Sequence, residues 1–246
     1  MAEHRQLTHP PLREAVIDLR LAEELPASVV DEIGRERLPD FEPPIQMWRS
    51  QISFPVGPPG LPPPLLPPNA NEPFGWRFHR SDGARVIQLR RDGVTFGVTQ
   101  GYTTWAEAKG FARGVVERYC GWAGNASVAR IAVRYINVLA VPVGEDFDLY
   151  LTAGPRVPPG VPNILSAFLH RVVIPFSQDR ASAIVTQALE QLGDATVSVV
   201  LDIDVWTESR LQMDALEIWT TLDVLRDIKN RIFFGSVTER ALEPYL

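Results

Sequence analysis

Short runs in which apolar and polar residues alternate constrain the fold of this chain most strongly. The clearest are RIAVRYIN at residues 130–137 and VVLDIDVW at residues 199–206. Because successive side chains of a β-strand point to opposite faces, a period of two predicts strands that are buried on one side only. We therefore expect a sheet with one apolar face, which must be covered by other elements.

The first half of the chain combines such strands with one long helix. Strands are predicted at residues 14–21, 46–54 and 75–99. The Asp-Gly pairs at residues 82–83 and 92–93 divide the last range into three strands, because Asp-Gly is a strong hairpin signal. The period then changes to 3.6, which predicts a helix over residues 103–122, with Thr104 as its cap and Glu107 three residues later.

The second half repeats this order. Strand-like runs occupy residues 128–141, 165–176, 180–191 and 195–209, and an amphipathic helix is predicted over residues 213–232. The run at 180–191 is also compatible with a helix, since its Ala, Gln and Glu residues do not favour strands. We expect an α+β fold, in which a duplicated unit of antiparallel strands plus one long helix occurs at residues 1–122 and again at 123–246. The two halves are expected to form one body.

Two further segments stand out. Residues 55–73 are so rich in proline that we expect an extended, polyproline-like loop at the surface, either a rigid insertion or a ligand for an aromatic groove. Near the C-terminus, Ser236 and Glu239 have the spacing of a capping box, which predicts a short last helix. Phe233, Phe234 and Tyr245 are candidates to dock this helix or to form a partner surface.

Composition excludes several classes of protein. The net charge of −6 over 246 residues opposes non-specific binding to nucleic acid. The chain has no apolar run long enough for a membrane span, no apolar segment typical of a secretory signal, and one cysteine. A cytoplasmic protein without membrane association is therefore expected. The four histidines are scattered, and no nucleotide-binding loop or hydrolase motif is present, so we expect no cofactor and no zinc site.

The charged residues in the two clearest strands are the candidate site. Arg130 and Arg134 share one strand face, and Asp202 and Asp204 share one face of the other strand. A charge in a strand of this kind must be paired, bind a ligand or reach solvent. If the two strands are neighbours, arginine–aspartate pairs satisfy all four charges, and the simplest interpretation is a polar ladder that fixes the register.

A second interpretation is a binding groove on the same face. In it, Arg130 and Arg134 bind an anionic group and the two aspartates orient the guanidinium groups. Trp206, Tyr135 or Trp76 would then stack against the ligand. Replacement of Arg134 by Ala separates this groove from the ladder, because only the groove predicts lost binding with retained folding.

A third interpretation is metal chemistry. Two aspartates at i and i+2 of a strand hold divalent cations in polymerase-like domains. Asp202 and Asp204 have this spacing, and Asp146 and Asp148 are possible further ligands. The alternative function is accordingly a metal-dependent nucleotidyl-processing enzyme.

Nucleic-acid recognition is a minor alternative. It would use three arginines close to the second Asp-Gly turn, Arg85, Arg90 and Arg91. The acidic net charge of the chain opposes it.

Several motifs together resemble a known family. They are EAVIDLRL at residues 14–21, GWRFHRSDGARVIQLRRDGVTF at 75–96, RIAVRYINVLAVP at 130–142, VVLDIDVW at 199–206 and the segment from 222 to the end. The chain is similar to uncharacterised proteins of about this size that are sporadically distributed among bacteria and archaea. The resemblance implies no catalytic residues, and the distribution resembles that of mobile defence or toxin–antitoxin operons.

We therefore expect a non-enzymatic binding or adaptor protein. Its expected ligand-binding residues are Arg130, Arg134, Asp202, Asp204, Tyr135 and Trp206. The expected partner is another protein, a second copy of the chain or a small anionic ligand, with a role in a mobile defence-type operon.

Overall fold

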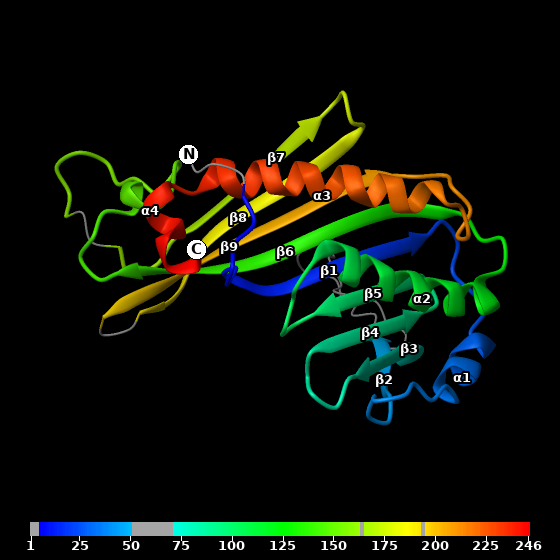
Figure 1. Cartoon of the computed structure of the whole chain (residues 1–246). Helices are drawn as coiled ribbons and strands as arrows, with labels where there is room; N and C mark the ends of the chain where they lie inside the picture. The colour runs from blue at the N-terminus through cyan, green and yellow to red at the C-terminus, as the bar shows by residue number, and fades with distance from the viewer. Residues whose placement is uncertain (1–4, 51–70, 163–164, 193–194) are drawn as a thin grey trace, which may run out of the picture.

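The computed structural model describes residues 5–50, 71–162, 165–192 and 195–246, and nine strands form one sheet within them (Figure 1). The strands are β1 (Leu12–Leu21), β2 (Ile45–Ser50), β3 (Asn71–His79), β4 (Arg85–Arg90), β5 (Gly93–Val98), β6 (Val128–Pro142), β7 (Leu169–Phe176), β8 (Ala181–Leu192) and β9 (Thr196–Glu208). They lie in the order β2-β3-β4-β5-β1-β6-β9-β8-β7. All neighbours are antiparallel.

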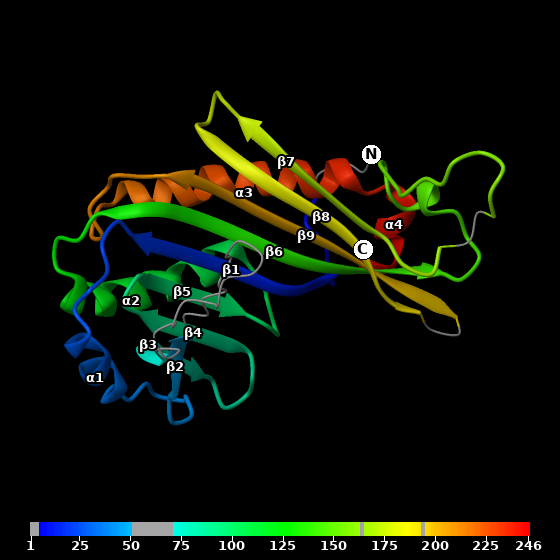
Figure 2. The same ribbon diagram turned by 180° about the vertical axis from the view of Figure 1, so that it is seen from behind.

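The helices cover one face of this sheet. They are α1 (Ser28–Gly34), α2 (Trp105–Ala123), α3 (Glu217–Ser236) and α4 (Glu239–Leu242), with single 3₁₀ turns at η1 (Phe147–Leu149) and η2 (Glu243–Tyr245). Figure 1 shows α3 in front of the strands, and Figure 2, the view from behind, shows the strands in front of α3. We call the side that bears Leu19, Ile131 and Ile203 the helix face, and the side that bears Asp18, Arg130 and Asp204 the open face.

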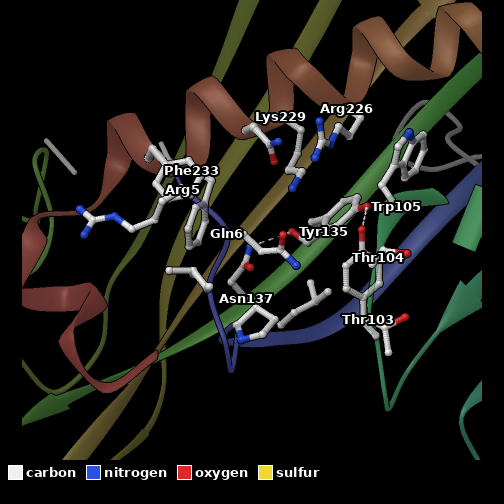
Figure 3. Close-up of a pocket in the computed structure, with 16 residues that line it drawn as sticks. Arg5, Gln6, Thr103, Thr104, Trp105, Tyr135, Asn137, Arg226, Lys229 and Phe233 are labelled. Atoms are coloured by element: carbon white, nitrogen blue, oxygen red, sulfur yellow. Dashed lines mark hydrogen bonds between the residues drawn. The ribbon is translucent and has the colours of Figure 1, made fainter. Parts of the chain in front are cut away.

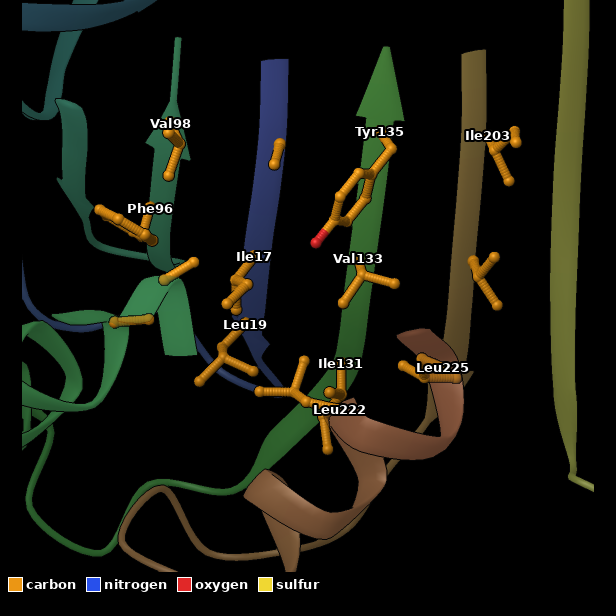
Figure 4. Close-up of a cluster of buried hydrophobic side chains, with 14 of the residues drawn as sticks. Ile17, Leu19, Phe96, Val98, Ile131, Val133, Tyr135, Ile203, Leu222 and Leu225 are labelled. Atoms are coloured by element: carbon orange, nitrogen blue, oxygen red, sulfur yellow. The ribbon is translucent and has the colours of Figure 1, made fainter. Parts of the chain in front are cut away.

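The core lies between the sheet and the two long helices. Leu19, Ile131 and Ile203, from β1, β6 and β9, are completely buried on the helix face. Leu222 and Leu225 of α3 pack over the same region (Figure 4). Burial of each such side chain stabilises the fold by about 1.5–3 kcal/mol. The apolar residues that alternate in the strands and those that recur with a period of 3.6 in the helices therefore pack into the same core.

Both predicted hairpins are confirmed. Asp82 and Gly83 lie between β3 and β4, and the Asp92-Gly93 pair joins β4 to β5. Both glycines have positive φ, 73° at Gly83 and 144° at Gly93. At Gly93 a Cβ atom would lie 2.0 Å from the carbonyl oxygen of Leu19, so glycine is required both by the backbone conformation and by the neighbouring strand.

Of the two predicted helix caps, one is confirmed. The hydroxyl of Thr104 accepts a hydrogen bond from the N–H of Glu107 at 3.2 Å. The prediction of Ser236 as a cap is wrong, because Ser236 is the last residue of α3. Its hydroxyl donates to the carbonyl of Ile232 at 2.7 Å, and Thr238 caps α4 instead.

Three segment predictions have different outcomes. The run for which a helix was an alternative is a strand, β8, which pairs with strands on both sides. The strand predicted over residues 46–54 is present as β2 up to Ser50. Residues 51–70, which hold the rest of that run and nearly all of the proline-rich segment, lie outside the described residues. Residues 71–73, predicted as the end of the proline-rich loop, begin β3 instead.

The expected α+β fold made of a duplicated unit with one long helix is wrong. The structure is dominated by a single sheet, with 41% of the residues in strands and 26% in helices. The reason is that β1 and β6, the first strands of the two halves, pair directly, with Ile17 opposite Val133. The strands of both halves are thus joined into one continuous sheet. The predicted boundary after residue 122 falls at the C-terminal end of α2, before β6, and a division into two repeats stays a prediction.

Within the part of the chain that the structure describes, no helix is both long and apolar enough to cross a membrane.

Candidate functional site

The four charged side chains in the two clearest strands meet on the open face, where β6 and β9 are neighbours. Arg134 donates from Nε and Nη2 to the two oxygens of Asp202, at 2.8 and 2.6 Å. Arg130 donates from Nη2 to both oxygens of Asp204, at 3.1 and 2.9 Å. Since Asp204 is opposite Arg134 in the register, both pairs run diagonally across the strands. The predicted contacts are confirmed, whereas a role in ligand binding stays a prediction.

Asp18 on β1 extends this cluster across the sheet. Its oxygens accept from Arg130 at 3.2 Å, Arg90 at 3.1 Å, Arg20 at 3.0 Å and Thr95 at 2.6 Å. Burial raises the pKa of Asp18, but the charge of Arg90 and the bonds from Thr95 and Arg20 outweigh it and hold the pKa below its ordinary value. We call Asp18, Arg20, Arg90, Arg130, Arg134, Asp202 and Asp204 the charged ladder.

The pKa of Asp204 is shifted in the opposite direction from that of Asp18. Burial raises its pKa above the ordinary value, and the positive charges of Arg130 and Arg134 offset this only in part. The guanidinium of Arg130 also lies 5.5 Å from the ring centroid of Trp206, in a cation–π contact. Trp206 is thus the aromatic residue that joins the ladder.

The other two predicted aromatic partners lie elsewhere. Tyr135 follows Arg134 in β6 and therefore points to the helix face, where it is buried. The indole N–H of Trp76 donates to the carbonyl of Val30 at 2.7 Å, which ties β3 to α1. The structure therefore does not assemble a groove of arginines with all three aromatic residues.

The metal interpretation gains no support from the described residues. Asp202 and Asp204 each accept from a guanidinium group, so both carboxylates are engaged. Asp148 pairs with Arg156 at 3.1 Å, and Asp146 accepts from the backbone N–H of Asp148. Throughout the described ranges, no group of three or more His, Cys, Asp or Glu residues is placed to hold a metal ion.

The three arginines considered for nucleic-acid binding do not form one exposed patch. Arg90 is buried within the charged ladder, with 4% of its side chain exposed. Arg85 is also buried and pairs with Glu107 at 3.1 Å. Arg91 donates to the carbonyl of Leu25 at 2.9 Å. Each of the three arginines thus has a partner within the protein.

The sequence analysis missed a pocket on the helix face. Its volume is about 300 Å³, and it lies between α3, β6, the N-terminal segment and the loop that precedes α2 (Figure 3). The lining residues are Arg5, Gln6, Leu7, Pro10, Leu12, Tyr102, Thr103, Thr104, Trp105, Tyr135, Asn137, Arg226, Lys229, Asn230, Phe233 and Phe234. We call it the Lys229 pocket. Three of the lining residues are cationic, and no lining residue is Asp or Glu.

Helix and strand periods explain how these side chains converge. Arg226, Lys229, Asn230 and Phe233 follow the i, i+3, i+4, i+7 spacing of one helical stripe on α3. Tyr135 and, two residues on, Asn137 point to the same face of β6. The sequence signal was therefore present, as polar residues beside the apolar stripe of α3, but the stripe alone does not reveal which strand it faces.

Lys229 is the most unusual residue of the pocket. Its Nζ atom lies 3.7 Å from the ring centroid of Tyr135, and among the described residues it forms no ion pair with a carboxylate. Burial and, to a smaller extent, the charge of Arg226 lower the pKa of Lys229 to about 7, against the opposing charge of Asp227. Lys109 of α2 differs, because both oxygens of Asp223 bind its Nζ, at 2.7 and 2.8 Å.

Two tyrosines add hydroxyl groups to the lining of the Lys229 pocket. The hydroxyls of Tyr102 and Tyr135 lie 3.1 Å apart and share a hydrogen bond (Figure 3). Burial raises the pKa of both, so both hydroxyls stay protonated near neutral pH. Asn137, on the same strand, donates to the carbonyl of Leu201 at 3.1 Å, which fixes its orientation. The pocket therefore offers neutral hydrogen-bonding groups beside an amine and a guanidinium.

Comparisons with known proteins do not extend this description. No family model, no curated protein and no solved structure matches the chain. The resemblance to a sporadically distributed family therefore stays a prediction, and function must be inferred from the residues of this chain.

Proposed function

We propose that this chain is a non-enzymatic binding protein that holds a small anionic ligand in the Lys229 pocket. The observation that carries the proposal is the charge of the lining, where three cations and no described carboxylate face one cavity. This is unusual in a chain with a net charge of −6. Two of the three cations have acidic partners outside the lining, because Arg226 pairs with Asp227 at 3.0 Å and Arg5 pairs with Glu239, whereas among the described residues no carboxylate pairs with Lys229.

The donors of the pocket suit an oxyanion. Arg226 supplies a planar guanidinium and Lys229 an ammonium group when protonated, and both favour carboxylate or phosphate oxygens. The hydroxyls of Tyr102 and Tyr135 add neutral hydrogen-bonding groups. Leu7, Leu12 and Phe233 supply apolar surface for the rest of the ligand. A volume of about 300 Å³ is at the lower end for ligand sites, which favours a small molecule.

The open face is the less favourable place for an anion. Arg134 and Arg130 each already bind a carboxylate through two hydrogen bonds. An incoming anion would have to compete with these aspartates or use the few remaining donors, with little net positive charge to attract it. For this reason the expected anionic ligand is assigned to the Lys229 pocket and the ladder to the maintenance of the sheet.

A protein partner is a second proposal, carried by the edge strand β7. Among the described strands, β7 pairs only with β8, so its outer edge is unpaired. Leu169 and Val173 on its open-face side are 73% and 63% exposed. Exposed edges of this kind pair with further strands, of a second copy or of another protein. An adaptor role in a mobile defence-type operon stays a prediction, and co-purification from the native host would identify the partner.

The binding proposal is tested by titration of the purified chain with small anions. Acetate, lactate, phosphate and sulfate are compared by calorimetry at constant ionic strength, since non-specific attraction depends on salt. Arg226→Gln should weaken the binding of the preferred anion at least about tenfold, since a hydrogen bond to a charged group contributes about 1.5–3 kcal/mol. Arg231→Gln is the matched control, because it removes an exposed charge from the same helix outside the pocket. Equal affinities of the two variants would contradict the proposal.

A further inference from the structure

Lys229 combines the features of a reactive amine. An amine attacks carbonyl carbon only when it is neutral, and desolvation beside a second cation is a recognised way to keep it so. Lys229 lines a cavity, and within the described ranges no carboxylate forms an ion pair with it. The Tyr135 ring, 3.7 Å from its Nζ, favours the ammonium form, but burial outweighs this contact. The only other lysine in the sequence, Lys109, is bound by Asp223.

We propose that Lys229 captures the carbonyl carbon of a small oxo acid as an imine, while the acid group of that ligand binds beside Arg226. The inference rests on the proposed function, because the anionic group occupies the same pocket. It adds the chemical class of the ligand and a covalent bond to the protein.

The bond changes balance without another reactant. The lone pair of the neutral Nζ forms a bond to the carbonyl carbon, and the oxygen takes a proton to give a carbinolamine. A carbon–nitrogen double bond then replaces the carbon–oxygen bond, and the oxygen leaves as water with the two hydrogens that the amine has lost. Nothing is oxidised or reduced. The protonated hydroxyls of Tyr102 and Tyr135 are groups of the same pocket that can hydrogen-bond the carbonyl oxygen.

The charged and titratable groups around Lys229 support a neutral amine near pH 7. From α3 they are Arg226, which lowers its pKa, and Asp227, which raises it, and burial decides the balance. From β6 and the loop before α2 they are Tyr135 and Tyr102, whose pKa values are raised by burial. From the N-terminal segment Arg5 lines the same pocket and pairs with Glu239. Reaction should therefore accelerate as the pH rises towards about 7 and then level off.

Reductive trapping tests the inference directly. The full chain is incubated with pyruvate or glyoxylate and sodium cyanoborohydride, which reduces an imine to a stable amine, and the modified lysine is located by peptide mass spectrometry. We expect Lys229 to be modified at least about tenfold faster than Lys109, because the pKa of Lys229 is lowered to about 7, whereas the amine of Lys109 is bound by both oxygens of Asp223. Lys229→Arg should abolish the adduct while the far-UV circular dichroism stays unchanged. Equal modification of both lysines, or of Lys109 alone, would overturn the inference.

Two further ligands separate this inference from the proposed function. Lactate carries the carboxylate but no carbonyl group, and acetone carries the carbonyl group but no charge. If lactate binds and protects the pocket but pyruvate leaves no adduct on Lys229, the imine is refuted and the anion site stands. If acetone is trapped as fast as pyruvate, the anion site is refuted and the reactive amine stands. We expect trapping of pyruvate to exceed that of acetone at least about tenfold and to be inhibited by lactate.

Discussion

The Nζ atom of Lys229 lies 3.7 Å from the ring centroid of Tyr135, one residue after Arg134 in β6 but on the opposite face of the sheet. Neighbouring residues of one strand thus belong to two different polar environments. On the open face, Asp202 forms an ion pair with Arg134 and compensates its charge. On the helix face, Lys229 lacks such a compensating carboxylate among the described residues, and this difference is the basis for placing the ligand there.

The first prediction concerns the protonation of Lys229. Because the chain has only two lysines, selective ¹³C labelling of lysine gives two side-chain Cε signals, and Lys109→Arg assigns them. The Lys229 signal should titrate with a midpoint of about 7, because burial disfavours the ammonium form. A midpoint above 10 would show that the ammonium is well solvated and would remove the physical basis of the reactive amine.

A second prediction concerns stability. The folded state lowers the pKa of Lys229 from 10.5 to about 7, so the unfolded state binds more protons in this interval and wild-type stability rises with pH across it. Lys229→Met removes this partly buried charge and should increase the free energy of unfolding by roughly 1–3 kcal/mol at pH 6. This difference should shrink between pH 7 and 9. Urea unfolding of both proteins at several pH values measures it, and a loss of stability on substitution would contradict the prediction.

A third prediction concerns the charged ladder. Asp18→Asn removes the carboxylate charge shared by the buried Arg90 and by Arg130, although Asp92 still pairs with Arg90, and should destabilise the fold by about 3 kcal/mol. Asp202→Asn, the matched control, faces the half-exposed Arg134 and should cost below about 1 kcal/mol.

The same pair of variants has a defined pH dependence. Because its folded-state pKa is lowered, Asp18 stabilises the protein above its unfolded pKa of 3.8, and this contribution is lost as the pH falls through the lower folded value. The difference between wild type and Asp18→Asn should thus shrink below about pH 4. Similar losses for both variants at pH 7 in chemical denaturation would show that Asp18 is not the centre of the ladder.

A fourth prediction concerns the edge strand. If β7 mediates self-association, Val173→Lys should lower the fraction of dimer measured by size-exclusion chromatography with light scattering, because a charge at an exposed edge position opposes pairing with another strand. Val143→Lys is the control, since Val143 is 53% exposed but follows β6 and lies outside β7. A wild-type protein that stays monomeric at high concentration would exclude a second copy as the occupant of this edge.

Local features of the fold could be predicted because local physics determines them. Alternation located β1, β6 and β9, and the Asp-Gly pairs located both hairpins, where glycine is needed for positive φ. The side on which Arg130 and Arg134 point followed from strand geometry alone. The diagonal choice of partners, Arg134 with Asp202 instead of Asp204, depends on how the side chains lean across the strands and could not be predicted.

The global arrangement depends on contacts between distant segments. Nothing in the alternation of β1 or β6 indicates that these two strands pair, and their pairing joins the strands of both halves into the single sheet that dominates the structure. The Lys229 pocket likewise depends on contacts between distant segments. It requires Lys229 on α3, Tyr135 on β6 and the N-terminal segment to meet, which the stripe of one helix cannot reveal.

The most direct test of the account compares the two faces in one experiment. Wild type, Lys229→Met and Arg134→Gln are titrated with the anion that the wild type binds best, by calorimetry at pH 6, where Lys229 is mainly protonated. We predict that Lys229→Met weakens binding at least about tenfold and that Arg134→Gln leaves it unchanged within about twofold, because the ligand lies on the helix face. Loss of binding in Arg134→Gln together with full affinity in Lys229→Met would contradict the account and return the ligand to the open face.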